Sequence, residues 1–382
     1  MILPSQLNAE DEIEKRVVSG FVFGRFWKMN WTWVDQVLRY DWDDIQKSAF
    51  LILLPFNERV WSRVSDHLGD KSERLYWMKV DVNPFGPDHD LTLAIEKLIE
   101  FGRAPEAVLC VYRTIRDETR FKEKLAVRAL LNVLETPDAG NQLDPNRTVD
   151  VINRLQQSPT VELDALFKIE WNLLPLLDRF SSGSPVTLER RLASDPAFFA
   201  EVVALIFRST NEDEDISGFS EERKNLAQNA YRLLSEWKIC PGMLPDDSFD
   251  AVIFREWLEE AIRITETTGH NQVAQIQIGH VFTHAPPDPD GLWIHDAVAS
   301  ALNARNAAEM RSGFTTELLN QRGVYGFTAG REERELAQLN REKAEALEER
   351  SHSRFATAMR KIAESYERQA DQESRRSESE ER

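Results

Sequence analysis

The sequence predicts an all-α fold, an irregular α-solenoid of stacked helical hairpins with a helical C-terminal tail. Apolar residues recur at i, i+3, i+4 and i+7 in most segments, and almost no stretch shows the period of two that marks a β-strand. The segments come in pairs of helical length, joined by short links rich in Gly, Pro and Asp. Pairs of this kind are typical of α-solenoids. The same observations allow a compact all-α bundle, and the irregular period matches no named repeat.

The clearest hairpin lies between residues 91 and 115. Gly102 is a natural end for its first helix, and Pro105 suits the first turn of its second. Helices joined by so short a link must run antiparallel. The two apolar stripes are Leu91, Ala94, Ile95, Leu98 and Ile99, and then Val108, Val111, Tyr112 and Ile115.

The remaining helices are predicted in chain order from the same periodicity and from capping residues. Asp41 or Asp43 can cap one helix near the N-terminus, and Asn57 can cap the next. Pro175 should kink a long helix because it removes a backbone hydrogen bond. The predicted helical ranges after the first hairpin are 121–135, 147–157, 162–180, 188–192, 196–208, 220–237, 249–268, 271–285 and 307–321, with a further helix around Ile294, Val298 and Leu302.

Changes in composition suggest the domain organisation. Residues 1–330 form the predicted repeat-like array, and the acidic stretch 211–222 is a mobile loop that could subdivide it. Residues 331–370 carry dense charges of both signs and two short apolar stripes, which predicts a charged helical tail packed partly on the array. The stripes are too short for a strict coiled coil. Residues 371–382 are expected to be disordered.

Charge and composition exclude several classes of protein. The net charge of −18 argues against a nucleic-acid partner. No apolar run reaches the ~20 residues that span a bilayer, and the acidic N-terminus is unlike a secretory signal. The two cysteines, Cys110 and Cys240, fit a reducing compartment, so a cytoplasmic location without membrane attachment is expected. Neither a phosphate-binding GxxxxGK[ST] nor a GxSxG serine motif occurs, and no cofactor is predicted.

The densest group of histidines lies in the predicted hairpin 271–305. His280 and His284 are one helical turn apart, and His295 and Asp296 follow at the start of the second helix, where Asp288 or Asp290 could act as the cap. Two imidazoles at i and i+4 can bind one zinc ion, which makes a metal-dependent hydrolase or nuclease the alternative function. HExxH is absent and no cysteine is near. The favoured interpretation is therefore a packed hairpin without metal, in a chain that is not an enzyme.

Two other groups of residues are candidate sites. Asp81, Asp88, His89 and Asp90 could hold a divalent cation or an acid–base pair, but helix caps and turns explain them more simply. Neither cysteine has a basic neighbour that would favour a reactive thiolate.

The N-terminal region is unusually aromatic, since six of the ten tryptophans fall in the first 77 residues. This density indicates either a heavy local core or a surface that a partner covers. The predicted interaction surface consists of Phe21, Phe26, Trp27, Trp31 and Trp33, extended by Val17.

Six phrases occur in order across nearly the whole chain: SGFVFGRFWKMNWTWVD, ERLYWMKVDVNPF, LAIEKLIEFGRAPEAVLCVYRTI, PPDPDGLWIHDAVASALNA, MRSGFTTELLNQRGV and FATAMRKIAESYERQA. Together they resemble the C-terminal region of a group of very large, uncharacterised bacterial helical-repeat proteins. The resemblance implies an origin in genomic islands, a link to phage defence, and a chain that is the C-terminal part of a larger protein. It supplies no catalytic residue.

The expected function is a non-catalytic platform for protein–protein interaction. A solenoid offers extended faces, and tryptophan is the residue type that contributes most to interface energy. The expected partner is a separate N-terminal portion, a second copy, or a phage or host protein, and the overall charge favours one that is basic or neutral.

Overall fold

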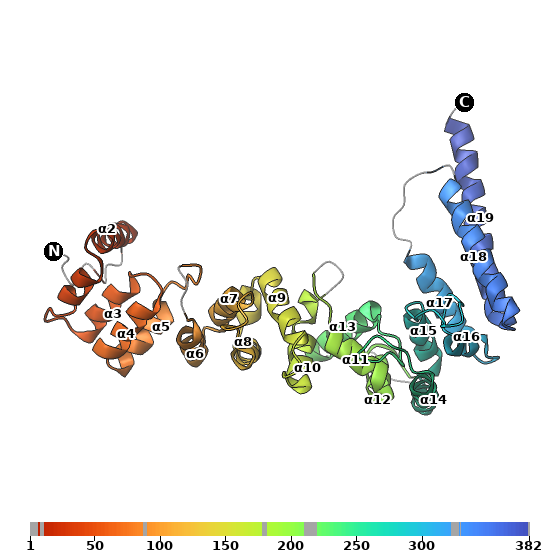
Figure 1. The fold of residues 1–382 in the computed structure, drawn as a ribbon, viewed down its shortest axis with the longest axis horizontal. Coiled ribbons are helices and arrows are strands. Elements are labelled where there is room, and N and C mark those ends of the chain that lie inside the picture. The colour runs from red at the N-terminus through yellow and green to blue at the C-terminus, as the bar shows by residue number, and fades with distance from the viewer. Residues whose placement is uncertain are drawn as a thin grey trace. The chain divides into compact units, whose positions relative to one another are not determined.

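The computed structural model describes residues 7, 11–86, 90–177, 182–209, 220–321, 328 and 330–380, and the regular secondary structure of this part is entirely helical (Figure 1). It contains no β-strand, and the one isolated bridge joins Met243 and Phe249. The prediction of an all-α fold is therefore confirmed. None of the described helices is long and apolar enough to cross a membrane.

The chain divides into two compact units, residues 1–184 and 185–382. This boundary differs from the one expected at residue 331, which falls inside the second unit. The helices of the first unit are α2 (Glu12–Val37), α3 (Asp44–Ile52), α4 (Glu58–His67), α5 (Asp70–Lys79), α6 (Thr92–Glu100), α7 (Ala104–Thr114), α8 (Glu123–Glu135), α9 (Pro145–Gln156) and α10 (Leu163–Asn172), with 3₁₀ turns at Ala139–Gln142 and Leu174–Leu176.

The second unit has the same character. Its helices are α11 (Val186–Ser194), α12 (Pro196–Ile206), α13 (Glu221–Glu236), α14 (Ala251–Thr267), α15 (Asn271–Phe282), α16 (Asp296–Asn303), α17 (Ala308–Asn320), α18 (Arg331–Glu349) and α19 (Ser353–Glu380).

Side chains of Asp and Asn fix where many of these helices begin. Asp43 accepts from the backbone N–H of Gln46, whose side chain accepts in return from the N–H of Asp43. Asn57 accepts from the N–H groups of Arg59 and Val60. Such bonds satisfy amides that a helix leaves unpaired at its start, and they confirm Asp43 and Asn57 as the caps that the sequence indicated.

Within each unit, helices pack mainly on the next helix in sequence or on the next but one, as α15 does on α17. In the first unit α6 contacts α7, α7 contacts α8, and α8 contacts α9 and α10. The hairpin at 91–115 forms as predicted, with α6 and α7 joined through Gly102, whose φ of +73° only glycine adopts without strain. This pattern of nearest-neighbour packing is the one expected of stacked helical hairpins.

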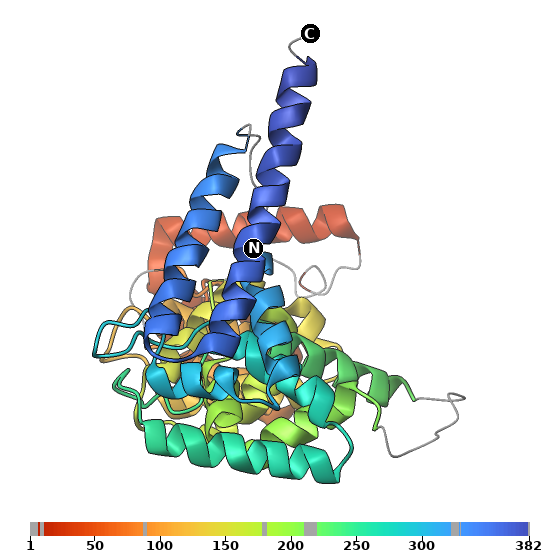
Figure 2. The ribbon, with the colours of Figure 1, turned by 90° about the vertical axis from the view of Figure 1, so that its right-hand side faces the viewer.

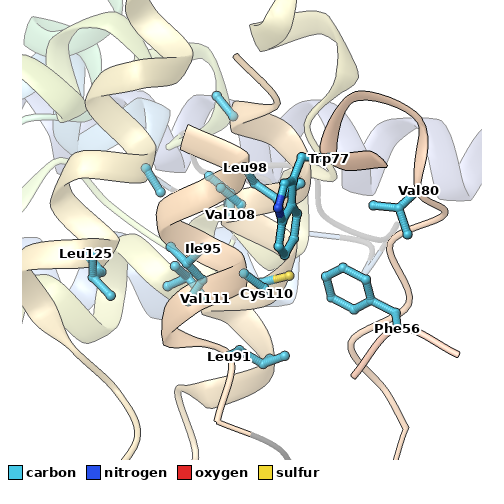
Figure 3. Close-up of a cluster of buried hydrophobic side chains, with 14 of the residues drawn as sticks. Phe56, Trp77, Val80, Leu91, Ile95, Leu98, Val108, Cys110, Val111 and Leu125 are labelled. Carbon is cyan, nitrogen blue, oxygen red and sulfur yellow. The ribbon is translucent and has the colours of Figure 1, made fainter. Parts of the chain in front are cut away.

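The core of the first unit runs from Val18 to Leu177. Figure 3 shows part of it, where Trp77 lies close to Leu98 and Val108, and Cys110 lies between this group and Phe56. Trp61, Tyr76 and Trp77 are almost fully buried and their rings contact one another. Many of the aromatic side chains in the N-terminal region therefore belong to the core.

Pro175 ends a helix where the sequence predicted only a kink. α10 stops at Asn172, and Pro175 lies in the 3₁₀ turn Leu174–Leu176. Proline cannot donate the hydrogen bond that would continue the helix, and here the chain tightens into a 3₁₀ turn. Residues 178–180 of the predicted helix lie outside the described part of the chain.

The predicted tail is an antiparallel hairpin of α18 and α19 (Figure 2). Arg334 bonds Ser374, Arg341 pairs with Glu367, and Arg360 pairs with Glu348, so partners advance seven residues along α18 as they retreat seven along α19. α19 continues to Glu380, although disorder was predicted from residue 371. One reason is that the Glu373 carboxylate accepts from the backbone N–H of Gly330, beside the start of α18. Residues 381 and 382 are outside the described part.

Candidate functional site

The histidine-containing hairpin forms, but its second helix is capped differently from the prediction. α16 begins at Asp296, and Nδ1 of His295 accepts from the backbone N–H of Ala297 at 3.2 Å. Asp288 assists rather than caps, since one of its carboxylate oxygens accepts from the N–H of Asp296 at 2.9 Å. This bond is the main reason that the pKa of Asp288 lies below its usual value. The polar turn thus stabilises the start of α16.

His280 lies on α15 and His284 lies in the turn that follows it, both close to Glu317 of α17. Burial is the main cause that lowers the pKa of His280, and the nearby Glu317 carboxylate opposes it. The pKa of His284 is also lowered, first by partial burial and then by the Lys238 ammonium. Both imidazoles therefore favour the neutral form, in which a ring nitrogen is free to accept a proton or a metal ion.

The other two members of the proposed metal set have different neighbours. The ring of His295 contacts that of Phe249, with 4.3 Å between centroids. Asp296 pairs with His352 of the α18–α19 turn at 2.9 Å. Across the described residues, no group of three or more His, Cys, Asp or Glu is placed to hold a metal ion. His280, His284, His295 and Asp296 are thus not gathered around one point.

The acidic group after α5 is only partly described, because Asp88 and His89 lie outside the described residues. Asp90 accepts from both the backbone N–H and the hydroxyl of Thr92, and these bonds lower the pKa of its carboxyl group. This is the turn-forming role that the simpler interpretation assigned to Asp90.

Both cysteines are free and buried, and burial raises the pKa of each thiol. A raised pKa suppresses the thiolate, which is the reactive form. Neither side chain therefore has the environment of a nucleophile.

The acidic stretch 211–222 is described only from Ser220 onward. Ser220 Oγ accepts from the backbone N–H of Arg223 at 3.3 Å, so it caps α13, whose predicted range began at this residue. Residues 211–219 lie outside the described part of the chain.

The N-terminal helix α2 presents apolar side chains on two opposite faces. Val18 and Val22 point into the core. On the opposite face, Trp27 is 72% exposed and Val17 is 66% exposed, and Phe21 lies at the edge of the same face with 37% of its surface exposed. Ile13 and Phe23, which the sequence analysis did not single out, are 73% and 58% exposed. A helix with apolar residues all round is normally covered on all sides.

The remaining residues of the predicted surface are partly covered by the unit itself. Phe26, Trp31 and Trp33 pack against the core, and the guanidinium of Arg63 lies 4.7 Å from the centre of the Trp31 ring. The helix is interrupted at Asn30, whose φ of +55° turns the chain before Trp31. This break separates the exposed aromatic residues before it from the half-buried ones after it.

A groove of about 280 Å³ lies beside this break. It is lined by Phe21, Arg25 and Met29 before the break and by Trp33, Tyr40 and Trp42 after it. The Arg25 guanidinium stacks over the Phe21 ring at 5.5 Å and donates to the sulfur of Met29. The exposed face of α2 and this groove together form the aromatic surface of the first unit.

A larger groove in the second unit was not predicted. It has a volume of about 670 Å³ and runs between α17 and α19. Its charged lining residues are Arg311, Arg354, Lys361 and Arg368, and no Asp or Glu lines it. The seven-residue spacing of the last three was visible in the sequence, but their meeting with Arg311 depends on how two separate helices pack.

Compared with known proteins, the chain matches no family model, no curated protein and no solved structure.

Proposed function

We propose that this chain is a non-catalytic platform for protein–protein interaction, and that the first unit binds its partner through the outward face of α2. The observation that carries the proposal is the exposure of Ile13, Val17, Phe23 and Trp27 on one side of a helix whose other side is buried. Exposed apolar side chains gathered on one element mark an interaction site, whereas single exposed ones do not. Trp27 is the natural anchor, because tryptophan is enriched among the residues that dominate interface energy.

The charge of α2 indicates what kind of partner fits. The whole chain carries −18, yet residues 15–34 contain Lys15, Arg16, Arg25 and Lys28 and no acidic residue. A local cationic field around an apolar face favours a neutral or acidic partner surface. At this site, a neutral or acidic partner replaces the basic or neutral partner that the overall charge favours.

The same charges disfavour pairing of α2 with a second copy of itself. The exposed face is centred on Gly20 and Gly24, beside which a Cβ would meet no atom within 4 Å. An antiparallel pair centred there would set Arg16 against Lys28, and a parallel pair would set each cation against its own copy. Like charges face each other in both arrangements, which favours a different protein as partner.

Further parts of the proposal rest on the sequence. The resemblance supports a bacterial origin, a role in phage defence and a larger protein of which this chain is the C-terminal part. The two free, buried cysteines support a reducing, cytoplasmic location.

Capture of partners from the native cell tests the function. The double variant Val17→Ser/Trp27→Ala should lose the partners that the wild type retains. Tyr231→Ala, which removes a 61% exposed ring from α13, should retain them. Trp31 is a poor choice for substitution because it is half-buried against Phe26 and Arg63.

Two results would contradict the proposal. One is equal recovery of every partner by the wild type and the Val17→Ser/Trp27→Ala variant. The other is a wild type that recovers no specific partner, elutes as a monodisperse monomer and binds no dye for exposed apolar surface.

A further inference from the structure

The groove between α17 and α19 has an unusual chemistry for so acidic a chain. Arg311 comes from α17, and Arg354, Lys361 and Arg368 come from α19 (both helices are labelled in Figure 1). Serine and threonine hydroxyls stand between these cations. The groove therefore gathers positive charge and hydrogen-bond donors, with no carboxylate in its lining to neutralise them.

The three cations that α19 contributes to the groove differ from Arg360 of the same helix in their partners. Within the described part of the chain, Arg354, Lys361 and Arg368 make no ion pair with Asp or Glu, whereas Arg360 on another side of the same helix pairs with Glu348 at 2.9 Å. Arg368 donates only to the backbone oxygen of Glu364 in its own helix. α19 thus has one side neutralised by α18 and another left cationic.

Arg311 is held in place by the end of α16. Its Nη1 donates to the backbone oxygens of Leu302 at 2.6 Å and Ala304 at 2.7 Å. Burial is the main cause that lowers the pKa of this guanidinium, and the nearby Arg354 lowers it further. Two guanidinium groups repel each other here, and an anion between them would relieve that repulsion.

The spacing of the cations indicates what shape of anion would fit them. Arg354, Lys361 and Arg368 recur every seventh residue of one helix, which places them about 10.5 Å apart over roughly 21 Å. That length exceeds a single nucleotide. Two turns of a partner α-helix advance by about the same distance, so carboxylates repeated every seven residues on such a helix would meet the row in register.

We infer that this groove binds an amphipathic helix of another protein that carries a row of Glu or Asp side chains. The carboxylates pair with Lys361, Arg368 and the neighbouring arginines. The apolar side chains of the incoming helix rest on Leu319 and Ala358, between α17 and α19. This is the helix-in-groove mode of recognition, with charge setting the orientation and the register.

A nucleic acid fits the groove less well. No aromatic residue lines it, so unpaired bases would have nothing to stack on. The chain's net charge of −18 would repel a polymer that carries one negative charge per nucleotide much more strongly than a helix with a few carboxylates.

Direct binding to the full-length chain tests the inference. The probe is a fluorescent synthetic helix of three heptads (about 21 residues), with Glu at one position of each heptad beside Leu and Ala. The wild type should bind it in an anisotropy titration. Lys361→Glu/Arg368→Glu should bind it about tenfold or more weakly, because two attractive pairs become repulsive. That variant should instead prefer the same peptide with Lys in place of Glu.

The matched control is Lys124→Glu/Arg128→Glu, which makes the same change of charge on the exposed side of α8. It should bind the Glu peptide as the wild type does, and circular dichroism should show equal helicity for all variants. If both variants bound the Glu peptide equally weakly, the loss of affinity would be an effect of overall charge, and the inference would be overturned. Failure of the wild type to bind would do the same. So would tighter, groove-dependent binding of a single-stranded oligothymidine or of inorganic polyphosphate, which would assign the groove to phosphate.

Discussion

At the scale of single residues, His280 and His284 couple the stability of the second unit to pH. Their pKa values are lowered in the folded state, so below about pH 6.5 the unfolded chain binds more protons than the folded one. Above that pH the folded and unfolded chains bind nearly the same number of protons, so these histidines do not affect the free energy of unfolding. As the pH falls below it, the free energy of unfolding decreases, and the decrease stops once the pH is below the folded pKa values. His280→Gln/His284→Gln should therefore lose less free energy of unfolding than the wild type between pH 7.5 and pH 5.5.

Urea titrations at the two pH values measure this difference. Glu317→Gln serves as the control in the opposite direction, because its carboxylate raises the pKa of both histidines. Removing that carboxylate should steepen the loss of stability. An identical pH dependence in the wild type and the double histidine variant would show that these imidazoles do not titrate differently on folding.

At the scale of elements, two glycines determine how closely α15 and α17 approach. A Cβ on Gly279 would overlap the backbone of Met310, and a Cβ on Gly313 would overlap the backbone of Ile276. Gly279→Ala should thus destabilise the chain by about 1–3 kcal/mol through overpacking. Gly20→Ala in α2 meets no atom within 4 Å and should stabilise by about 0.5–1 kcal/mol. Chemical denaturation measures the free energy of unfolding of both variants. Equal changes of the same sign would show that close backbone contact does not distinguish the two positions.

Sequence periodicity predicted the elements better than their contacts. The stripes of 91–115 and the caps Asp43 and Asn57 were predictable because they depend on bonds within about one turn. The contact of Gly279 with Gly313's helix was not, since a close approach of two backbones leaves no periodic signal. The cationic groove was missed for the same reason, because Arg311 and Arg354 lie on separate helices. For the aromatic surface, the sequence identified α2 but could not separate exposed Trp27 from half-buried Trp31.

At the scale of the whole molecule, the change in composition at residue 331 falls inside a compact unit, residues 185–382. Charge density changes at residue 331, yet α18 and α19 are attached to the preceding helices of the same unit. Asn303 Oδ1 accepts from the backbone N–H of Arg354 at 2.8 Å, and His352 pairs with Asp296. Phe355 is fully buried and its ring contacts those of Trp293 and Phe314. A change in surface charge is therefore compatible with one continuous core.

These contacts predict where the chain can be divided. A fragment of residues 185–382 should fold by itself and unfold in one cooperative urea transition, because it is a compact unit that keeps the contacts of Phe355 with Trp293 and Phe314. A fragment of residues 185–330 should be less stable by more than the ~3–5 kcal/mol that loss of one buried phenylalanine costs, since it loses the whole of α19. Helicity and urea midpoints of the two fragments measure the difference. If 185–330 were as stable as 185–382, then α18 and α19 would be an appendage, and the groove that α19 forms with α17 would lose its structural basis.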